Sequence, residues 1–287
     1  MGTILYYLIL KPLSLFPLPI LYWFSDIAYF FVYRIFGYRK EVIFENLANA
    51  FPDKSAAERK EIAGKFYHFI TDLMIEILWC FSLSEKRIRH RFKVINPELL
   101  DDFYDAGKSV VLVLGHYSSW EMVLSSLNLF VKHRVSTIYI PLTNKGLDRM
   151  FYKMRTVFSA KMIAKKDFRE SFAEHDDELR AIIFGADQSP AVSKNIYWTQ
   201  FLNQDTAVAF GVEKYARKYD MPVVYSRLRR EMRGYYSLEF ETISAEPMAT
   251  AEGEISEQHV RLLEQEIIYQ PEFWLWSHKR WKKKRDV

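Results

Sequence analysis

The sequence predicts an α/β fold with a largely parallel central sheet flanked by helices. Short apolar runs rich in β-branched residues alternate with helical patterns, and the runs at 109–115 and 181–187 have the composition of fully buried strands. Alternation of such strands with helices is typical of a sheet that helices cover on its faces. The chain has 287 residues, so it can bury a core of this kind without disulfides or metal ions.

The first helix of the body is predicted to begin after Ser55. Ser55 and Glu58 have the Ser-x-x-Glu spacing of a capping box, and apolar residues recur at helical spacing from Ile62 to about Phe81. The further predicted strands are 109–115, 135–140, 181–187 and an antiparallel pair, 222–231 and 235–243, and the further predicted helices are 119–131, 145–158, 206–219 and 254–269. No internal repeat or low-complexity linker interrupts this order. We therefore expect one domain over 37–287, behind an amino-terminal membrane anchor over 1–36.

Glycine and cysteine usage excludes several classes of chemistry. The closest of the ten glycines, Gly107 and Gly115, are eight positions apart, which excludes a P-loop, a dinucleotide-binding glycine motif and a Gly-x-Ser-x-Gly elbow. Cys80 is the single cysteine, so no internal disulfide and no multi-cysteine zinc site can form. The polar run 175–177 is predicted to be a solvated turn rather than a set of metal ligands.

The amino-terminal segment is predicted to bind a membrane. Between Lys11 and Arg34, twenty-two residues carry one charge, Asp26, and include several tyrosines and a tryptophan. As one helix they would span about 33 Å, enough for a bilayer core, but three prolines argue against a straight helix. A short span and a helix lying in one leaflet both fit, and a buried core helix is the soluble alternative. Basic residues after the segment predict that the remaining chain lies in the cytoplasm.

The carboxyl end is strongly basic although the net charge of the chain is only +4. Residues 279–285 read KRWKKKR, a composition that suits an anionic surface, either phospholipid or nucleic acid. A solvated, frayed terminus is an equally good interpretation. The apolar segment at the other end of the chain favours lipid, so no nucleic-acid partner is expected.

The stretch from Gly115 to Glu121 is the candidate for chemistry. His116 follows the carboxyl end of a buried strand, where open α/β sheets place their sites, and Glu121 falls in the first turn of the next helix. We expect the carboxylate to contact the imidazole and fix its tautomer, which would let His116 activate an alcohol. A lone histidine near a glutamate is common, so spacing alone leaves the role open. Ser118 and Ser119 lack the elbow glycines and are predicted to be helix caps rather than nucleophiles.

Several blocks together resemble the lipid A biosynthesis (late, secondary) acyltransferase family of the lysophospholipid acyltransferase superfamily. His116 and Glu121 match its His-x-x-x-x-Asp/Glu motif. Similar blocks run along most of the chain at 37–55, 139–155, 184–189, 201–211 and 270–282. In the last block, Lys279 and Trp281 stand where the family usually has arginine and phenylalanine.

The resemblance implies a glycerolipid acyltransferase-like fold and a set of roles. His116 would be the general base on the acceptor hydroxyl, and Glu121 would orient it. Arg155 would stabilise the oxyanion. Asp187 would shape the same cleft, or else cap a loop, and Lys166 would bind an anionic head group, or else lie on a solvated face. No metal or redox cofactor is implied.

The resemblance also implies the substrates and the place of the reaction. The acyl donor would be an acyl carrier protein thioester, sometimes a coenzyme A thioester, and the acceptor a hydroxyl of a lipid A precursor. Another lysolipid or an aminolipid is the alternative acceptor, and a catalytically silent protein that binds lipid or nucleic acid is the alternative of another class. The expected location is the cytoplasmic face of a bacterial inner membrane.

Overall fold

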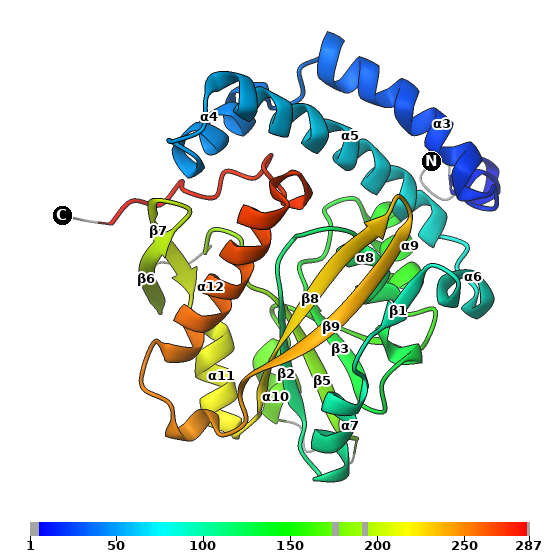
Figure 1. Ribbon diagram of the computed structural model, residues 1–287. Helices are drawn as coiled ribbons and strands as arrows, with labels where there is room; N and C mark the ends of the chain where they lie inside the picture. The colour runs from blue at the N-terminus through cyan, green and yellow to red at the C-terminus, as the bar shows by residue number, and fades with distance from the viewer. Residues whose placement is uncertain (1–5, 174–177, 191–194, 286–287) are drawn as a thin grey trace.

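A sheet of seven strands in the order β1-β9-β8-β2-β5-β3-β4 lies at the centre of the molecule (Figure 1). The computed structural model describes residues 6–173, 178–190 and 195–285. The strands of this sheet are β1 (Phe92–Val94), β2 (Val110–Leu114), β3 (Arg134–Tyr139), β4 (Lys161–Ala164), β5 (Arg180–Gly185), β8 (Val223–Met232) and β9 (Tyr235–Ser244). All neighbours pair in parallel except β8 and β9, which form an antiparallel hairpin. The predicted α/β class with a largely parallel sheet is confirmed.

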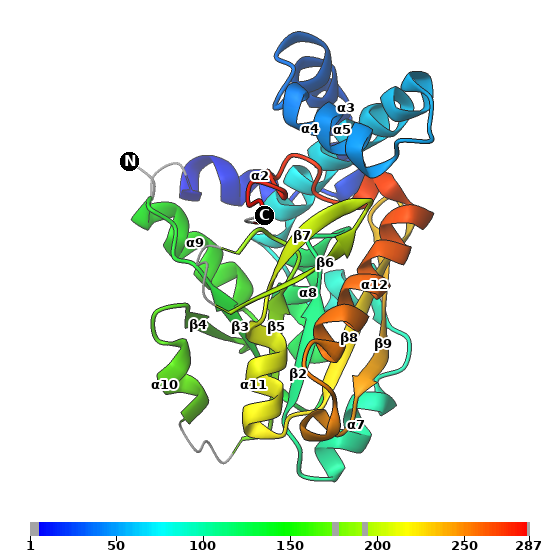
Figure 2. The ribbon, with the colours of Figure 1, turned by 90° about the vertical axis from the view of Figure 1, so that its left-hand side faces the viewer.

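Helices cover both faces of the sheet (Figures 1 and 2). One face packs against α7 (Glu98–Asp105), α8 (Trp120–Ser126) and α9 (Lys145–Arg155), and the other against α10 (Phe168–Ala173), α11 (Gly211–Tyr219) and the start of α12 (Glu254–Tyr269). The alternating residues of β2 explain why both faces need cover. Leu112 and Leu114 lie in the first core, whereas Val111 and Val113 lie in the second.

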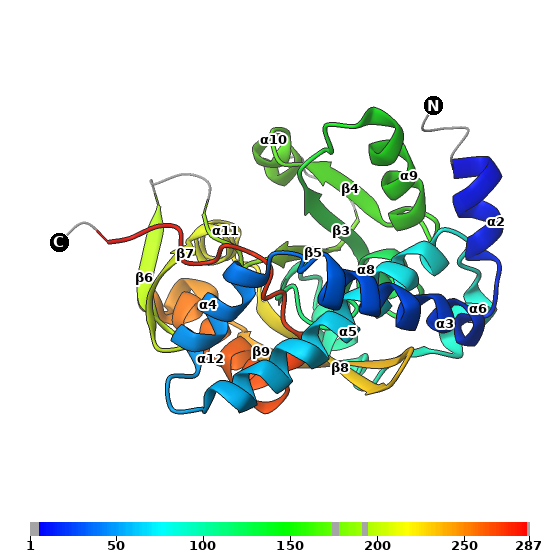
Figure 3. The same ribbon diagram turned by 90° about the horizontal axis from the view of Figure 1, so that it is seen from above.

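A third layer lies across the carboxyl end of the parallel strands (Figures 1 and 3). It consists of η1 (Tyr6–Leu10), α2 (Lys11–Ser14), α3 (Leu18–Tyr29), η2 (Phe30–Ile35), α4 (Lys40–Ala50), α5 (Ala56–Cys80) and α6 (Glu85–Arg89). The predicted start of α5 is confirmed, since Ser55 and Glu58 form the reciprocal hydrogen bonds of a capping box.

The prediction of one helix over 206–219 is wrong. Residues Gln204–Ala209 form strand β7, which pairs antiparallel with β6 (Ile196–Phe201), and helix α11 begins only at Gly211. The two strands are joined by Leu202 and Asn203, both with positive φ, as a two-residue hairpin turn requires. Pairing with β6 satisfies the backbone groups that a helix would otherwise have satisfied, so the tertiary pairing overrides the apolar pattern.

The amino-terminal segment is broken rather than continuous. Pro17 occupies the N-cap of α3 in an extended conformation, so α2 and α3 are separate helices. Within residues 6–173, 178–190 and 195–285, the structure contains no helix with the length and apolar character needed to cross a membrane. The expected spanning form of the anchor therefore has no support, whereas a helix lying in one leaflet stays a prediction.

Helix α3 is docked onto α5 along one face and exposed along the other. Tyr22 Oη donates to a carboxylate oxygen of the buried Glu76 at 2.6 Å, and Ser25 Oγ donates to the buried Asp72 at 2.7 Å. The opposite face of the segment carries exposed apolar side chains: Ile20, Trp23, Phe24, Ile27, Phe30, Phe31, Ile35 and Phe36. The segment thus belongs to the packed body on one side and presents an apolar surface on the other.

Candidate active site

The site forms where two neighbouring strands end side by side. Strands β2 and β5 pair in parallel with Leu114 opposite Gly185, so the residues that follow them leave the sheet at the same edge. His116 comes from the first strand end and Asp187 from the second. The carboxyl edge of a parallel sheet is where α/β proteins place their ligands, because the loops there are free to carry polar groups.

His116 and Asp187 form a hydrogen-bonded dyad. Nδ1 of His116 lies 2.7 Å from Oδ1 of Asp187, and Asp187 is buried. Gly185 makes room for the ring, because a Cβ at that position would lie 3.2 Å from Cε1 of His116. Since Nδ1 is engaged with the carboxylate, Nε2 is the nitrogen that can accept a proton from a substrate.

The contact between His116 and Asp187 shifts the pKa of both residues. Burial alone would lower the pKa of His116, but the charge of Asp187 and the hydrogen bond to it outweigh burial and raise that pKa. Burial would raise the pKa of Asp187, yet the charge of His116 and hydrogen bonds from His116 and Trp274 hold it low. Asp187 is therefore ionised at neutral pH, and the imidazolium that forms on proton uptake is stabilised.

Glu121 has a different partner from the one the sequence predicted. Its two carboxylate oxygens accept from Nε and Nη2 of Arg155 at 2.9 and 2.5 Å, and both side chains are largely buried. The predicted contact of Glu121 with His116 is replaced by the contact with Asp187. The cause is topological, because β5 adjoins β2 and carries Asp187 to the ring, while α9 packs on α8 and carries Arg155 to Glu121.

These groups face one cavity of about 460 Å³. His116, Glu121 and Arg155 line it together with a mostly apolar wall. Part of that wall follows a single row across the sheet, since Ile183 of β5 pairs with Thr137 of β3, which pairs with Met162 of β4. One cavity is thus lined by His116, which Asp187 holds, by Arg155, which Glu121 holds, and by a mostly apolar wall.

The loop after His116 is held by the carboxyl-terminal segment. Tyr117 forms an isolated β-bridge with Trp274, and the Ser118 N–H donates to the Phe273 carbonyl at 2.8 Å. Ser118 has a φ of 56°, a conformation that non-glycine residues rarely adopt without such support. Ser119 occupies the N-cap position of α8, but its side chain makes no capping hydrogen bond. Both serines are buried and neither lines the cavity.

Lys166 is not brought to this site. Its side chain is 82% exposed, lies 3.9 Å from Asp167 and is not part of the cavity lining. The run 175–177 lies outside the described residues. Sequence reasoning missed Asp187 as the partner of His116, although its place directly after a buried strand was a usable signal. It also missed Trp274, whose Nε1 donates to Asp187 at 2.9 Å and which no local pattern marks.

Comparison with known proteins identifies the family to which this chain is similar. The model of the family described as bacterial lipid A biosynthesis acyltransferase matches residues 1–283. The chain is 22% identical over 245 residues to the lipid A biosynthesis palmitoleoyltransferase of Escherichia coli K12, covering 85% of this chain and 79% of that protein. It is 20% identical over 251 residues to the lipid A biosynthesis lauroyltransferase of the same organism, covering 87% and 81% respectively.

Proposed function

Because the chain belongs to the bacterial lipid A biosynthesis acyltransferase family, and is thus an acyltransferase, we propose that it is a membrane-bound O-acyltransferase. It moves a fatty acyl chain from an acyl carrier protein thioester to a hydroxyl of a lipid A precursor. The observation that carries this proposal is the His116–Asp187 dyad beside an apolar cavity that also holds Arg155.

His116 acts as the general base. Its Nε2 takes the proton of the acceptor hydroxyl while the oxygen attacks the thioester carbonyl carbon. Asp187 holds the ring through Nδ1 and stabilises the imidazolium that forms. The tetrahedral intermediate then collapses with cleavage of the C–S bond, and the leaving thiolate takes the proton from His116. The products are the new ester and the free thiol of the carrier, and no acyl-enzyme forms.

Arg155 stabilises the oxyanion of the intermediate. The salt bridge to Glu121 uses Nε and Nη2, so Nη1 is the nitrogen that the geometry leaves for a substrate oxygen. Glu121 fixes the plane of the guanidinium. Because the bidentate pair already holds the positive charge in place, no reorganisation energy is needed when the oxyanion forms. Glu121 remains a catalytic-site residue in this scheme, acting through Arg155.

The apolar part of the cavity receives the acyl chain. Its wall includes Leu114, Leu124, Phe151, Met162 and Ile183, which offer no charge along the path away from His116. Near the opening, Ile140 and Leu142 line the cavity and are exposed to solvent. An apolar rim of this kind suits substrates that arrive from a lipid surface.

The enzyme binds the membrane through the exposed face of its amino-terminal helices. Lys11 of α2 donates to the Phe81 carbonyl at 3.0 Å, and the Phe81 ring packs edge-to-face on Phe151 of α9. Helix α2 therefore lies beside α9, which supplies Phe151 and Arg155 to the cavity wall (Figure 2). A helix lying in one leaflet with the catalytic domain on the cytoplasmic face would present the cavity to lipid.

The test is acyl transfer with matched donors. Purified protein in vesicles would receive a lipid A precursor with the same acyl chain on acyl carrier protein or on coenzyme A, and mass spectrometry would follow the product. The expected result is one added acyl chain, with the carrier protein as the better donor. Acylation of a lysolipid or an aminolipid instead would reassign the acceptor. No transfer to any hydroxyl lipid would overturn the proposal.

A further inference from the structure

The carboxyl-terminal segment, residues 271–281, is a packed part of the site and not a frayed basic tail. Trp274 and Arg280 are 1% and 3% exposed. The side-chain amide of Asn46 in α4 donates to the carbonyls of Trp276 and His278, at 2.8 and 3.0 Å. Two distant blocks of the sequence therefore lock together and fix the path of this segment beside the dyad.

Trp274 shares Asp187 with His116. The indole N–H donates to Oδ2 at 2.9 Å, while Oδ1 bonds His116 at 2.7 Å. Each carboxylate oxygen thus has its own donor, which fixes the plane of the carboxylate and hence of the imidazole. A donor on the second oxygen also withdraws electron density from the carboxylate and weakens its pull on the proton of His116.

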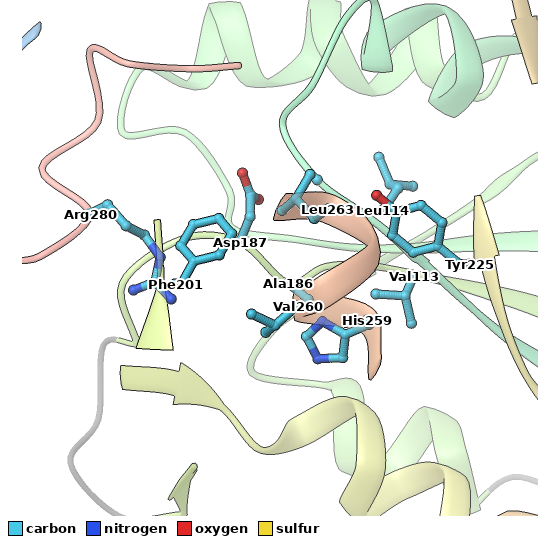
Figure 4. A pocket seen from close by; sticks show the side chains of 11 residues that line it. Val113, Leu114, Ala186, Asp187, Phe201, Tyr225, His259, Val260, Leu263 and Arg280 are labelled. Atoms are coloured by element: carbon cyan, nitrogen blue, oxygen red, sulfur yellow. The ribbon is translucent and has the colours of Figure 1, made fainter. Parts of the chain in front are cut away.

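Arg280 is a second buried residue of the carboxyl-terminal segment near Asp187. It lines a small cavity of about 10 Å³ with Asp187 and His259, whose side chains are visible in Figure 4. Its Nη2 donates to the Ala207 carbonyl at 2.7 Å, and no described acidic side chain forms a salt bridge with it. Burial lowers the pKa of Arg280 to about 10 while the charge of Asp187 opposes this, so the guanidinium stays cationic at neutral pH.

We propose that Trp274 and Arg280 are positioning residues that keep Asp187 ionised and limit how strongly it draws a proton onto His116. His116 then remains a free base near neutral pH, although a buried carboxylate holds it. This role rests on the proposed function, in which the neutral imidazole takes the proton of the acceptor hydroxyl. This role differs from simple packing because it depends on the charge of Arg280 and on the indole N–H of Trp274. Arg280→Met removes the charge and keeps a long side chain, and Trp274→Phe removes the donor and keeps an aromatic ring.

Other charged and titratable groups also face the dyad, and the substitutions leave them unchanged. They come from α8, α9, β8, α12 and the carboxyl-terminal segment: Glu121, Arg155, Tyr225, His259 and His278. Burial, followed by the charge of Arg280, lowers the pKa of His259 to about 4, so this histidine is neutral and adds no competing charge near pH 7.

The test measures the titration of His116 directly in the full-length protein. Imidazole NMR signals, with His116 identified by its loss in His116→Gln, would be followed with pH in Arg280→Met, Arg280→Lys and Trp274→Phe. We expect the pKa of His116 to rise in Trp274→Phe, which removes a donor 2.9 Å from Asp187, and to rise by less in Arg280→Met, which removes a buried charge that forms no salt bridge with Asp187. Arg280→Lys should stay near the wild type because it keeps the charge. The acid limb of kcat/KM should move to higher pH in the same order.

Trp281→Phe is the matched control. The Trp281 indole also packs on Trp274, but its N–H donates to Thr206 at 2.7 Å and not to Asp187. Trp281→Phe should therefore leave the pKa of His116 unchanged. An unchanged pKa of His116 in both Arg280→Met and Trp274→Phe, with thermal unfolding showing that they fold, would overturn the inference. Absence of acyl transfer by the wild-type protein would overturn the proposed function instead, whatever the titrations show.

Discussion

The guanidinium of Arg155 holds both carboxylate oxygens of Glu121, at 2.9 and 2.5 Å, at the wall of the cavity that contains His116. The His-x-x-x-x-Glu spacing predicted that Glu121 would contact His116. Asp187 makes that contact instead, hydrogen-bonded to the imidazole of His116, and Glu121 is paired with the guanidinium of Arg155. The site is therefore two hydrogen-bonded pairs that face one volume.

Glu121 and Arg155 should behave as one unit in kinetics. Glu121→Gln and Arg155→Met should each lower kcat by about 10²-fold, because either change removes the fixed charge that faces the oxyanion. The double variant should cost little more than the worse single one. Steady-state kinetics on all three variants makes the check. Multiplicative losses would mean that the two residues act separately.

Removal of the dyad should lower the rate and move the pH profile in a defined direction. His116→Ala should lower kcat/KM by about 10²–10⁴-fold. Asp187→Asn should lower the maximal rate and also move the acid limb to lower pH, because the charge of Asp187 raises the pKa of His116 while burial lowers it. Ser118→Ala and Ser119→Ala should stay active. A trapped acyl-serine, or a fully active His116→Ala, would contradict the mechanism.

Gly185→Ala should impair catalysis because it displaces the imidazole ring of His116. Its Cβ would lie 3.2 Å from Cε1 of His116, tighter than an ordinary carbon contact, so the imidazole must shift and its hydrogen bond to Asp187 is disturbed. We expect roughly tenfold or greater loss of kcat, since small misplacements of a catalytic group are costly. Gly211→Ala is the control, because a Cβ there meets nothing closer than 3.9 Å and should leave kcat unchanged. Equal activity of both variants would contradict the prediction.

The exposed face of α3 and η2 should determine membrane binding. Trp23→Ser with Phe30→Ser removes two large exposed apolar side chains and should weaken binding to lipid vesicles by about tenfold or more. Met248→Ser is the control, because Met248 is similarly exposed and the segment between β9 and α12 that carries it lies at the opposite end of the molecule from α3 (Figure 1). Vesicle flotation makes the comparison. Deletion of residues 1–34 is a poorer test, because it also removes Tyr22 and Ser25 from the buried carboxylates of α5.

Asp72 should carry much of the stability of the amino-terminal layer. It is fully buried and bonds Ser25 of α3 together with Arg230 and Arg233 of the β8–β9 hairpin, at 2.6–2.8 Å. Asp72→Ala should cost about 3–5 kcal/mol, because it removes the ion-pair partner of the largely buried Arg230, whereas the more exposed Arg233 keeps Asp26. Glu61→Gln breaks an exposed pair with Lys65 and should cost under about 1 kcal/mol. Thermal or denaturant unfolding measures both.

Local patterns sufficed for elements whose signal is contained within a few residues. The Ser55–Glu58 capping box started α5 where predicted, and the buried runs became β2 and β5. The same local logic failed for 206–209, because the partner strand β6 and the turn at Leu202 and Asn203 decided the conformation. Strand formation depends on the neighbouring strand that supplies the hydrogen bonds, so the pattern of 206–209 considered without β6 was misleading.

By itself the sequence determined the fold class, the family blocks and the location of His116 at the end of a buried strand. Only the tertiary structure decided which carboxylate holds His116, because Glu121 is five residues away and Asp187 seventy-one, and strand order brings the distant one into contact. It also showed that Arg280, within the predicted basic tail, is buried near that carboxylate, and that Trp274, which precedes the tail, donates to it. Hydrogen bonds and burial depend on distance in space, which the spacing of residues along the chain does not encode.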